Sequence, residues 1–166
     1  MRSLAVIVTH NRASLLQRAV FHLKHQTVKL DEILVVNNGS TDNTSQILKK
    51  LNVSYLSQEN VGSAGGWYAG IKYALKNNFD YCWLMDDDGF PASNAFELLK
   101  VNFPKDFSCL SSIVVREDQN DKLVFPMPRL NTYGHPSLRI CKRKVHKVCD
   151  LDADSIYPFA HLFNGA

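Results

Sequence analysis

Three consecutive aspartates, Asp86, Asp87 and Asp88, are the residues of this sequence most suited to chemistry. They directly follow residues 81–85, a short apolar run rich in aromatic side chains that is typical of a buried strand. Adjacent carboxylates repel one another, so such a cluster at a strand end is costly unless a cation neutralises it. Hard oxygen ligands suit Mg²⁺ or Mn²⁺, which can keep coordination positions open for phosphate oxygens. The sequence therefore favours a metal site over the alternative, a solvated acidic turn ending at Gly89.

The elements that must position these aspartates predict an α/β fold. Short apolar runs at residues 4–8, 33–36 and 81–85 predict strands, as does the mixed segment 53–56, and apolar residues at helical spacing follow each of them. Four such strand–helix units with short connections argue for a parallel sheet, right-handed crossovers and helices on both faces.

Polar residues and proline predict where the helices start. Ser14 is expected to cap the first helix, and Thr41 or Asp42 is expected to cap the second. Pro91 is expected in the first turn of a fourth helix that continues to Leu99.

Each predicted strand ends in a polar or glycine-rich cluster. The clusters are residues 9–12, 37–42, 60–66 and 86–88. Ligands of open α/β sheets bind outside the carboxyl ends of the strands, so these clusters should gather along one edge. Together they supply hydrogen-bonding groups for a base and ribose, backbone amides at a helix start for phosphates, and carboxylates for a metal. The predicted ligand is therefore a nucleoside diphosphate, although the glycine block by itself could equally serve tight helix–strand packing.

The regular alternation fades beyond residue 115. Residues 107–115 predict a fifth strand, whereas residues 123–133 contain two prolines that argue for a loop or an edge strand. The basic run 139–147 is an edge strand or a loop, and its charge marks either a solvated face or attraction to anionic lipid or a phosphate-bearing acceptor. The loss of the regular pattern predicts a domain boundary after residue 115, which divides the chain into residues 1–115 and 116–166.

Charge, cysteine spacing and hydropathy argue against several classes of protein. A formal charge of +3 over 166 residues gives no support for a nucleic-acid partner. The four cysteines have no metal-ligand spacing and are interpreted as reduced thiols. No apolar run approaches the length of a membrane span, and the N-terminus has a strand pattern rather than that of a signal peptide. We therefore expect a cytoplasmic protein.

Four motifs carry a resemblance to a known family. They are residues 6–12 (VIVTHNR), 35–42 (VVNNGSTD), 60–66 (NVGSAGG) and 86–88 (DDD). In wording, order and spacing these resemble the motifs of family 2 glycosyltransferases, most of all the branch of rhamnosyl- and galactofuranosyltransferases. The resemblance covers residues 1 to about 115 and implies the GT-A fold, a Rossmann-like, mostly parallel sheet with helices on both faces. It implies that residues 1–115 are the nucleotide-sugar-binding domain and that residues 116–166 are the incomplete start of an acceptor-side region.

The resemblance also implies roles for individual residues. Thr9 and Asn11 would line the nucleotide pocket, and Asn37 or Asn38 would hydrogen-bond the base. Relatives commonly carry Asp where this chain has Asn37, which changes both charge and geometry at the base. The other implied nucleotide-sugar contacts are Asn60, Gly65, Gly66, Asp86 and Asp87. The implied ligands of Mn²⁺ or Mg²⁺ are Asp86 and Asp88.

The implied function is transfer of a sugar from a UDP- or dTDP-sugar to a polysaccharide or glycolipid acceptor, with help from a divalent metal. In the family, an Asn-Gly-Ala like residues 164–166 lies near the middle, so the acceptor half and its general base are expected after residue 166. Two alternatives are a nucleotide-sugar-binding module without transferase activity and a nucleotidyltransferase. A homodimer formed through the apolar residues 159–163 and peripheral association with the inner face of a membrane stay open.

Overall fold

The computed structural model describes residues 1–103, 110–128 and 144–151. The chain divides into two compact units, Met1–Pro104 and the residues from Lys105 onward. Each unit is described here by itself. The functional division after residue 115 stays a prediction.

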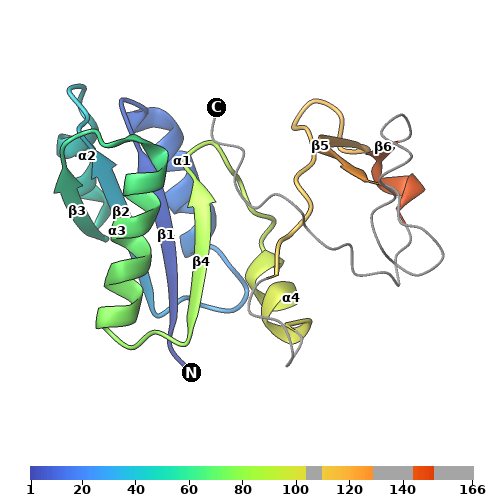
Figure 1. Cartoon of the computed structure of the whole chain (residues 1–166), viewed down its shortest axis with the longest axis horizontal. Coiled ribbons are helices and arrows are strands. Elements are labelled where there is room, and N and C mark those ends of the chain that lie inside the picture. Colours follow the sequence, from blue (N-terminus) through green and yellow to red (C-terminus); the bar gives the residue numbers. More distant parts are fainter. Residues whose placement is uncertain (104–109, 129–143, 152–166) are drawn as a thin grey trace. The chain divides into compact units, whose positions relative to one another are not determined.

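A four-stranded sheet forms the centre of the first unit (Figure 1). Its strands are β1 (Ser3–Thr9), β2 (Glu32–Asn38), β3 (Ser54–Gln58) and β4 (Tyr81–Asp86). They lie in the order β3-β2-β1-β4, and every neighbouring pair is parallel. The four predicted strands and the parallel sheet are thus confirmed, and β1 lies between β2 and β4.

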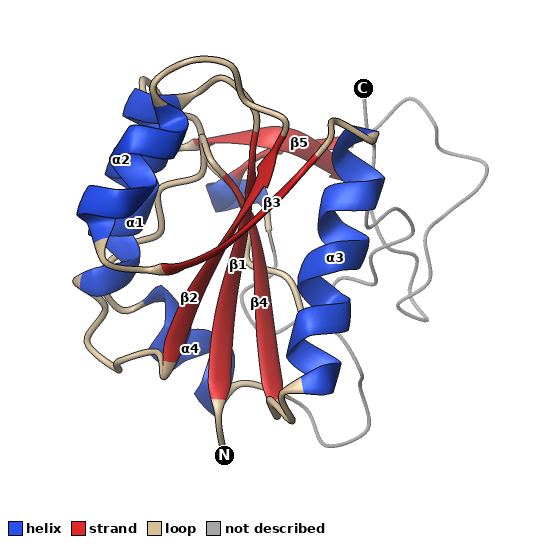
Figure 2. Cartoon of the chain, turned by 90° about the vertical axis from the view of Figure 1, so that its left-hand side faces the viewer, coloured by secondary structure: helices blue, strands red, loops and turns tan. Residues whose placement is uncertain are grey.

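Helices cover both faces of this sheet, as the strand–helix alternation predicts (Figure 2). On one face α1 (Ala13–Lys24) and α2 (Thr44–Leu51) pack on alternate residues of β1 and β2. On the other face α3 (Gly62–Lys76) packs on the intervening residues. Because successive strand side chains point to opposite faces, a central strand covered on both sides must be apolar throughout. This accounts for the wholly apolar run at residues 4–8.

The predicted starts of three helices need correction. Ser14 lies inside the first turn of α1, and the N-cap position of α2 is Asn43; neither N-cap side chain, Arg12 or Asn43, makes a capping bond. Asp42, one of the two residues predicted to cap the second helix, nevertheless accepts a hydrogen bond at Oδ1 from Thr44 N–H, the first residue of α2 (3.0 Å). The fourth helix, α4 (Ala95–Val101), begins four residues after Pro91. A tertiary contact fixes this start, because the buried side chain of Gln26 accepts a hydrogen bond from Phe96 N–H (2.9 Å) and donates one to the Ala92 carbonyl (2.8 Å).

The second unit contains a two-stranded antiparallel sheet of β5 (Lys122–Pro128) and β6 (Lys144–Lys147), followed by a short 3₁₀ helix, Val148–Asp150. The edge-strand alternative is therefore correct for these parts of 123–133 and 139–147. The predicted strand over 107–115 is wrong for its described part, since residues 110–114 are irregular and Val115 makes only an isolated bridge to Leu123.

Other predictions concern residues that lie outside the described ranges in whole or in part. Residues 159–163, on which the homodimer prediction depends, lie outside them. Of the four cysteines, Cys82 and Cys149 are described, and both are free thiols. None of the helices in the described part of the chain is long and apolar enough to cross a membrane.

Candidate functional site

The acidic turn that follows β4, residues 86–88, is bound directly to the loop that follows β1. Thr9, the last residue of β1, donates a hydrogen bond from Oγ1 to Asp87 Oδ2 (2.7 Å). Arg12 Nη1 donates to Asp87 Oδ1 (3.1 Å) and to Asp88 Oδ2 (3.2 Å). Asp87 is only 3% exposed, so its buried carboxylate has a partner at each oxygen. The loop after β1 therefore holds the turn after β4 through the middle aspartate.

The outer two aspartates are exposed, in contrast to Asp87. Partial burial, together with the nearby charges of Asp88 and Asp87, raises the pKa of the Asp86 carboxyl, and Arg12 only partly opposes this. The hydrogen bond and charge of Asp87 raise the pKa of the Arg12 guanidinium, which stays protonated. One guanidinium thus faces three carboxylates, and the turn keeps an excess of negative charge.

Asn11 connects the loop after β1 to the loop after β2. Its Oδ1 accepts hydrogen bonds from the backbone N–H of Thr41 (2.7 Å) and of Asp42 (3.3 Å), and its own N–H donates to Ser40 Oγ (3.0 Å). Its backbone is left-handed, with φ 55°, a conformation that asparagine tolerates better than most residues. Asn11 therefore orders the exposed surface of the second loop.

Asn38 connects the loop after β2 to the start of α3. Its Nδ2 donates to Asn60 Oδ1 (3.1 Å) and to the Gly62 carbonyl (3.0 Å), and its Oδ1 accepts from Gln58 Nε2 (2.9 Å). Asn37 is also enclosed, because Oδ1 accepts from Ser40 N–H (3.1 Å) and Nδ2 reaches a hydroxyl on α2. Both amides are at most 4% exposed.

The glycines near the start of α3 permit close packing. A Cβ on Gly66 would lie 2.5 Å from Val8 Cγ1 on β1, and one on Gly65 would lie 2.4 Å from Val61 Cγ2. Gly39, with φ 76°, faces the Asn60 backbone nitrogen at 2.7 Å from its hypothetical Cβ. Gly66 thus supports the packing interpretation of the glycine block, while the contact of this block with a sugar nucleotide stays a prediction.

Three sets of contacts thus join the four strand-end loops. They bring together the predicted site residues Thr9, Asn11, Asn37, Asn38, Asn60, Gly65, Gly66, Asp86, Asp87 and Asp88. Their roles toward a nucleotide or metal stay predictions. Two further residues belong to the cluster: Arg12, and His10, whose Nδ1 donates to the Asn38 carbonyl (2.9 Å). The signal for Arg12 was available in the sequence, since a cation at the end of one strand can balance carboxylates at the end of its neighbour.

The donor set of the acidic turn fits a hard divalent cation. Asp86 and Asp88 present exposed carboxylate oxygens, which is the ligand chemistry of Mg²⁺ and Mn²⁺. Within the described residues no three His, Cys, Asp or Glu side chains are placed to hold a metal ion. Two carboxylates completed by phosphate oxygens are a common arrangement for Mg²⁺, so the site suits an ion that arrives with a phosphorylated ligand.

Comparisons with known proteins show the family of the chain. The model of "Glycosyl transferase family 2" matches residues 4–160. Galactofuranosyltransferase GlfT1 of Mycolicibacterium smegmatis is 32% identical over an alignment of 167 positions, which covers 98% of this chain and 54% of that relative. GlfT1 of Mycobacterium tuberculosis is 31% identical over an alignment of 170 positions, which covers 98% of this chain and 53% of the relative. The chain spans about half the length of the curated relatives it matches.

A solved structure supports the fold. The structure of S. aureus TarS in complex with UDP matches with a TM-score of 0.54 at 21% identity, covering 61% of this chain and 31% of that one. At this identity the likeness concerns the fold alone, and it agrees with the GT-A arrangement expected from the sequence. The family match, which extends over most of the chain, decides the classification: this chain belongs to glycosyl transferase family 2.

Proposed function

We propose that the carboxyl edge of the sheet binds a nucleotide-sugar with a divalent metal, and that the chain takes part in transferring the sugar to a glycan or glycolipid acceptor. One observation carries the proposal: loops from all four strands are joined by hydrogen bonds into one polar surface beside an acidic turn with excess negative charge. Family membership makes sugar transfer the reaction to be expected there.

The chemistry of each side chain decides the role that we assign to it. Thr9, Asn11 and the loop around Asn37 and Asn38 shape the surface for the base and ribose, and Asn60 with the glycines borders the sugar. The carboxylates of Asp86 and Asp88 would hold Mn²⁺ or Mg²⁺. Such an ion supplies Lewis-acid stabilisation of the diphosphate leaving group. An acceptor hydroxyl also requires a general base within hydrogen-bonding reach, a role that we assign to none of the described residues.

The donor can be narrowed further. Because the GlfT1 relatives are galactofuranosyltransferases and the TarS structure contains UDP, UDP-galactofuranose is the first donor to test, with a dTDP-sugar second. The cytoplasm, at the inner face of a membrane that carries the glycolipid, is the proposed place of transfer. A peripheral membrane contact and a homodimer belong to the same proposal.

Calorimetric titration tests the donor site. UDP, dTDP and GDP are titrated into wild type and Asp88→Ala, each with and without Mn²⁺. We expect one nucleotide to bind in a Mn²⁺-dependent manner and the variant to lose that binding. Arg116→Ala, a change of an exposed charge in the second unit, is the control and should bind as wild type does. Absence of binding by wild type under every condition would overturn the proposal for this chain, and binding without sugar transfer to any acceptor would favour the non-catalytic module.

A further inference from the structure

Arg12 makes two ion pairs, one with a buried carboxylate and one with an exposed carboxylate. Its bond to Asp87 reaches a carboxylate whose side chain is 5% exposed, whereas the Asp88 side chain that it also contacts is 58% exposed. Removing the cation from a buried pair is costly because a buried charge is left alone, whereas exposed ion pairs contribute little. The bond to Asp87 is therefore the strong one, and the bond to Asp88 is easily given up.

Asp88 is also one of the two carboxylates that we assign to a metal. A divalent cation and the guanidinium of Arg12 would therefore compete for the same side chain. The hydrogen bonds of Asp87 to Thr9 and Arg12 can stay in place when Arg12 gives up its bond to Asp88. The arrangement can thus exist in two states that differ in a single exposed ion pair.

We propose that Arg12 is a positioning residue of the acidic turn: it anchors the turn through Asp87 and holds Asp88 until a divalent metal displaces it. This inference rests on the proposed function. Arg12 acts here as a counter-cation that belongs to the protein, so the three aspartates are partly neutralised before any metal arrives. Loss of the Arg12 guanidinium should therefore have two separable effects: a lower free energy of unfolding and a higher affinity for the metal ion in the absence of nucleotide.

Binding of Mn²⁺ alone, without nucleotide, measures the second effect. The free ion is followed by its electron paramagnetic resonance signal in wild type, Arg12→Met and Arg12→Lys. We expect Arg12→Met to bind Mn²⁺ up to about fivefold more tightly, the gain that corresponds to losing one exposed ion pair. Arg12→Lys keeps the charge and should stay within about twofold of wild type. A purely structural role would weaken binding in both variants.

Two controls separate the ion pair from net charge. Arg2→Met makes the same charge change at the opposite end of β1, where the guanidinium lies over Phe79 and donates to the Asn77 carbonyl, and should leave Mn²⁺ affinity unchanged. In an Asp88→Asn background the added Arg12→Met change should give no gain. An equal gain in that background, or an unchanged or weaker affinity in folded Arg12→Met, would overturn the inference.

Arg12→Met leaves the buried Asp87 carboxylate without its cation, which lowers the stability of the fold, and a second variant removes this difficulty. Arg12→Met combined with Asp87→Asn deletes both members of the buried pair, and Thr9 can still donate to the amide oxygen. This double variant should also bind Mn²⁺ more tightly than Asp87→Asn alone, and an equal affinity would contradict the inference. If wild type binds Mn²⁺ and Mn²⁺–UDP but the Arg12 variants show no change in Mn²⁺ affinity, the proposed function is supported and the proposed role of Arg12 is wrong. If wild type binds neither, both fall.

Discussion

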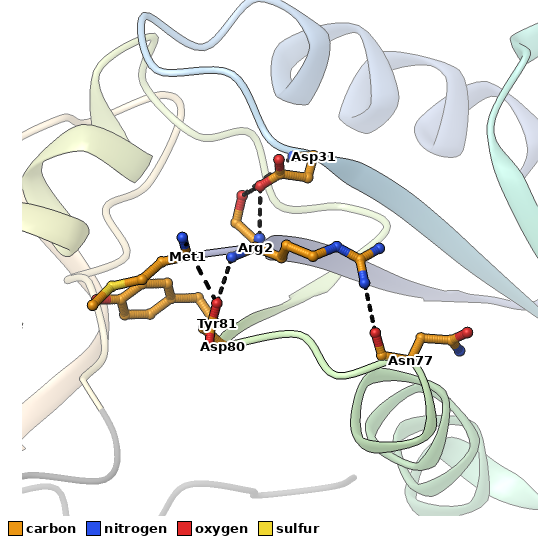
Figure 3. A network of polar contacts seen from close by, with 7 residues as sticks. Met1, Arg2, Asp31, Asn77, Asp80 and Tyr81 are labelled. Carbon is orange, nitrogen blue, oxygen red and sulfur yellow. Dashed lines mark hydrogen bonds and ion pairs between the residues drawn. The ribbon is translucent and has the colours of Figure 1, made fainter.

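The two ends of the parallel sheet use aspartate in opposite ways. At the amino end, Asp31 accepts hydrogen bonds from Ser3 N–H and Ser3 Oγ, both 2.7 Å, and Asp80 accepts one from Arg2 N–H at 2.6 Å (Figure 3). These carboxylates fasten the start of β1 to its neighbours. At the carboxyl end, Asp87 does the same through side chains, whereas within the described residues the Asp86 carboxylate has no hydrogen bond and that of Asp88 has only its bond to Arg12. The difference suggests a division of labour in which carboxylates with several hydrogen bonds stabilise the fold, and those with fewer are the ones that we propose for the metal.

The largest expected effect breaks the site and leaves the fold intact. Asp86→Asn should weaken Mn²⁺-dependent UDP binding by about 100-fold or more, since even changes to outer partners of a metal site cost about 10–100-fold. Burial and neighbouring charges disfavour the ionised Asp86, so the neutral amide should leave the free energy of unfolding unchanged or slightly higher. Calorimetry and urea unfolding measure the two quantities. A large loss of stability would place Asp86 with the structural carboxylates.

The second largest effect is expected for Thr9→Val, which should lower the free energy of unfolding. The substitution keeps the shape but leaves Asp87 Oδ2 buried without its hydroxyl donor, which costs about 1–3 kcal/mol. Thr41→Val is the matched control, because Thr41 is exposed and its hydroxyl makes only a 3.3 Å contact with Asn11. Urea unfolding of both variants provides the comparison. Equal effects would mean that Asp87 does not depend on its hydroxyl donor.

Asp31→Asn should act on stability alone, with a loss of about 1 kcal/mol for weakened charge-assisted hydrogen bonds. The bonds from Ser3 lower the pKa of Asp31 in the folded state, so its contribution is complete above the ordinary carboxyl pKa and disappears as the pH falls through the folded value. Unfolding curves of wild type and variant should therefore converge in acid. UDP affinity should not change, and a changed affinity would show that the two ends are coupled.

The smallest effect is expected for Tyr81→Phe. The hydroxyl of Tyr81 reaches only the sulfur of Met1, at 3.4 Å, and sulfur is a weak acceptor. The free energy of unfolding should change by less than about 0.5 kcal/mol, as is usual for surface positions without special contacts. Thermal unfolding is sufficient to measure this. Because the variant keeps the ring that packs edge-on to Phe103, a larger loss would show that the hydroxyl contributes more than its contact with Met1 accounts for.

Local pattern accounts for what the sequence predicts well. Three strands of the sheet, β1, β2 and β4, are marked by apolar runs, and the polar clusters follow because ligand-facing loops lie at the carboxyl ends of parallel strands. Contacts between distant residues account for the rest. The start of α4 depends on Gln26, and the side-chain amides of Asn37 and Asn38 form hydrogen bonds within the protein, to Ser40 and Gln58. A polar residue at a strand end has the same sequence signal whether its side chain faces a ligand or the protein.

The position of β4 beside β1 has a consequence for folding. The Thr9–Asp87 contact joins residues 78 positions apart, whereas the Ser3–Asp31 contact at the other end spans only 28. Closing the longer segment costs more chain entropy, so β3, β2 and β1 can assemble before β4 joins them. Until that step the acidic turn has no partner loop and cannot bind a nucleotide with its metal. Such a ligand should therefore slow unfolding of the chain and leave its folding rate nearly unchanged.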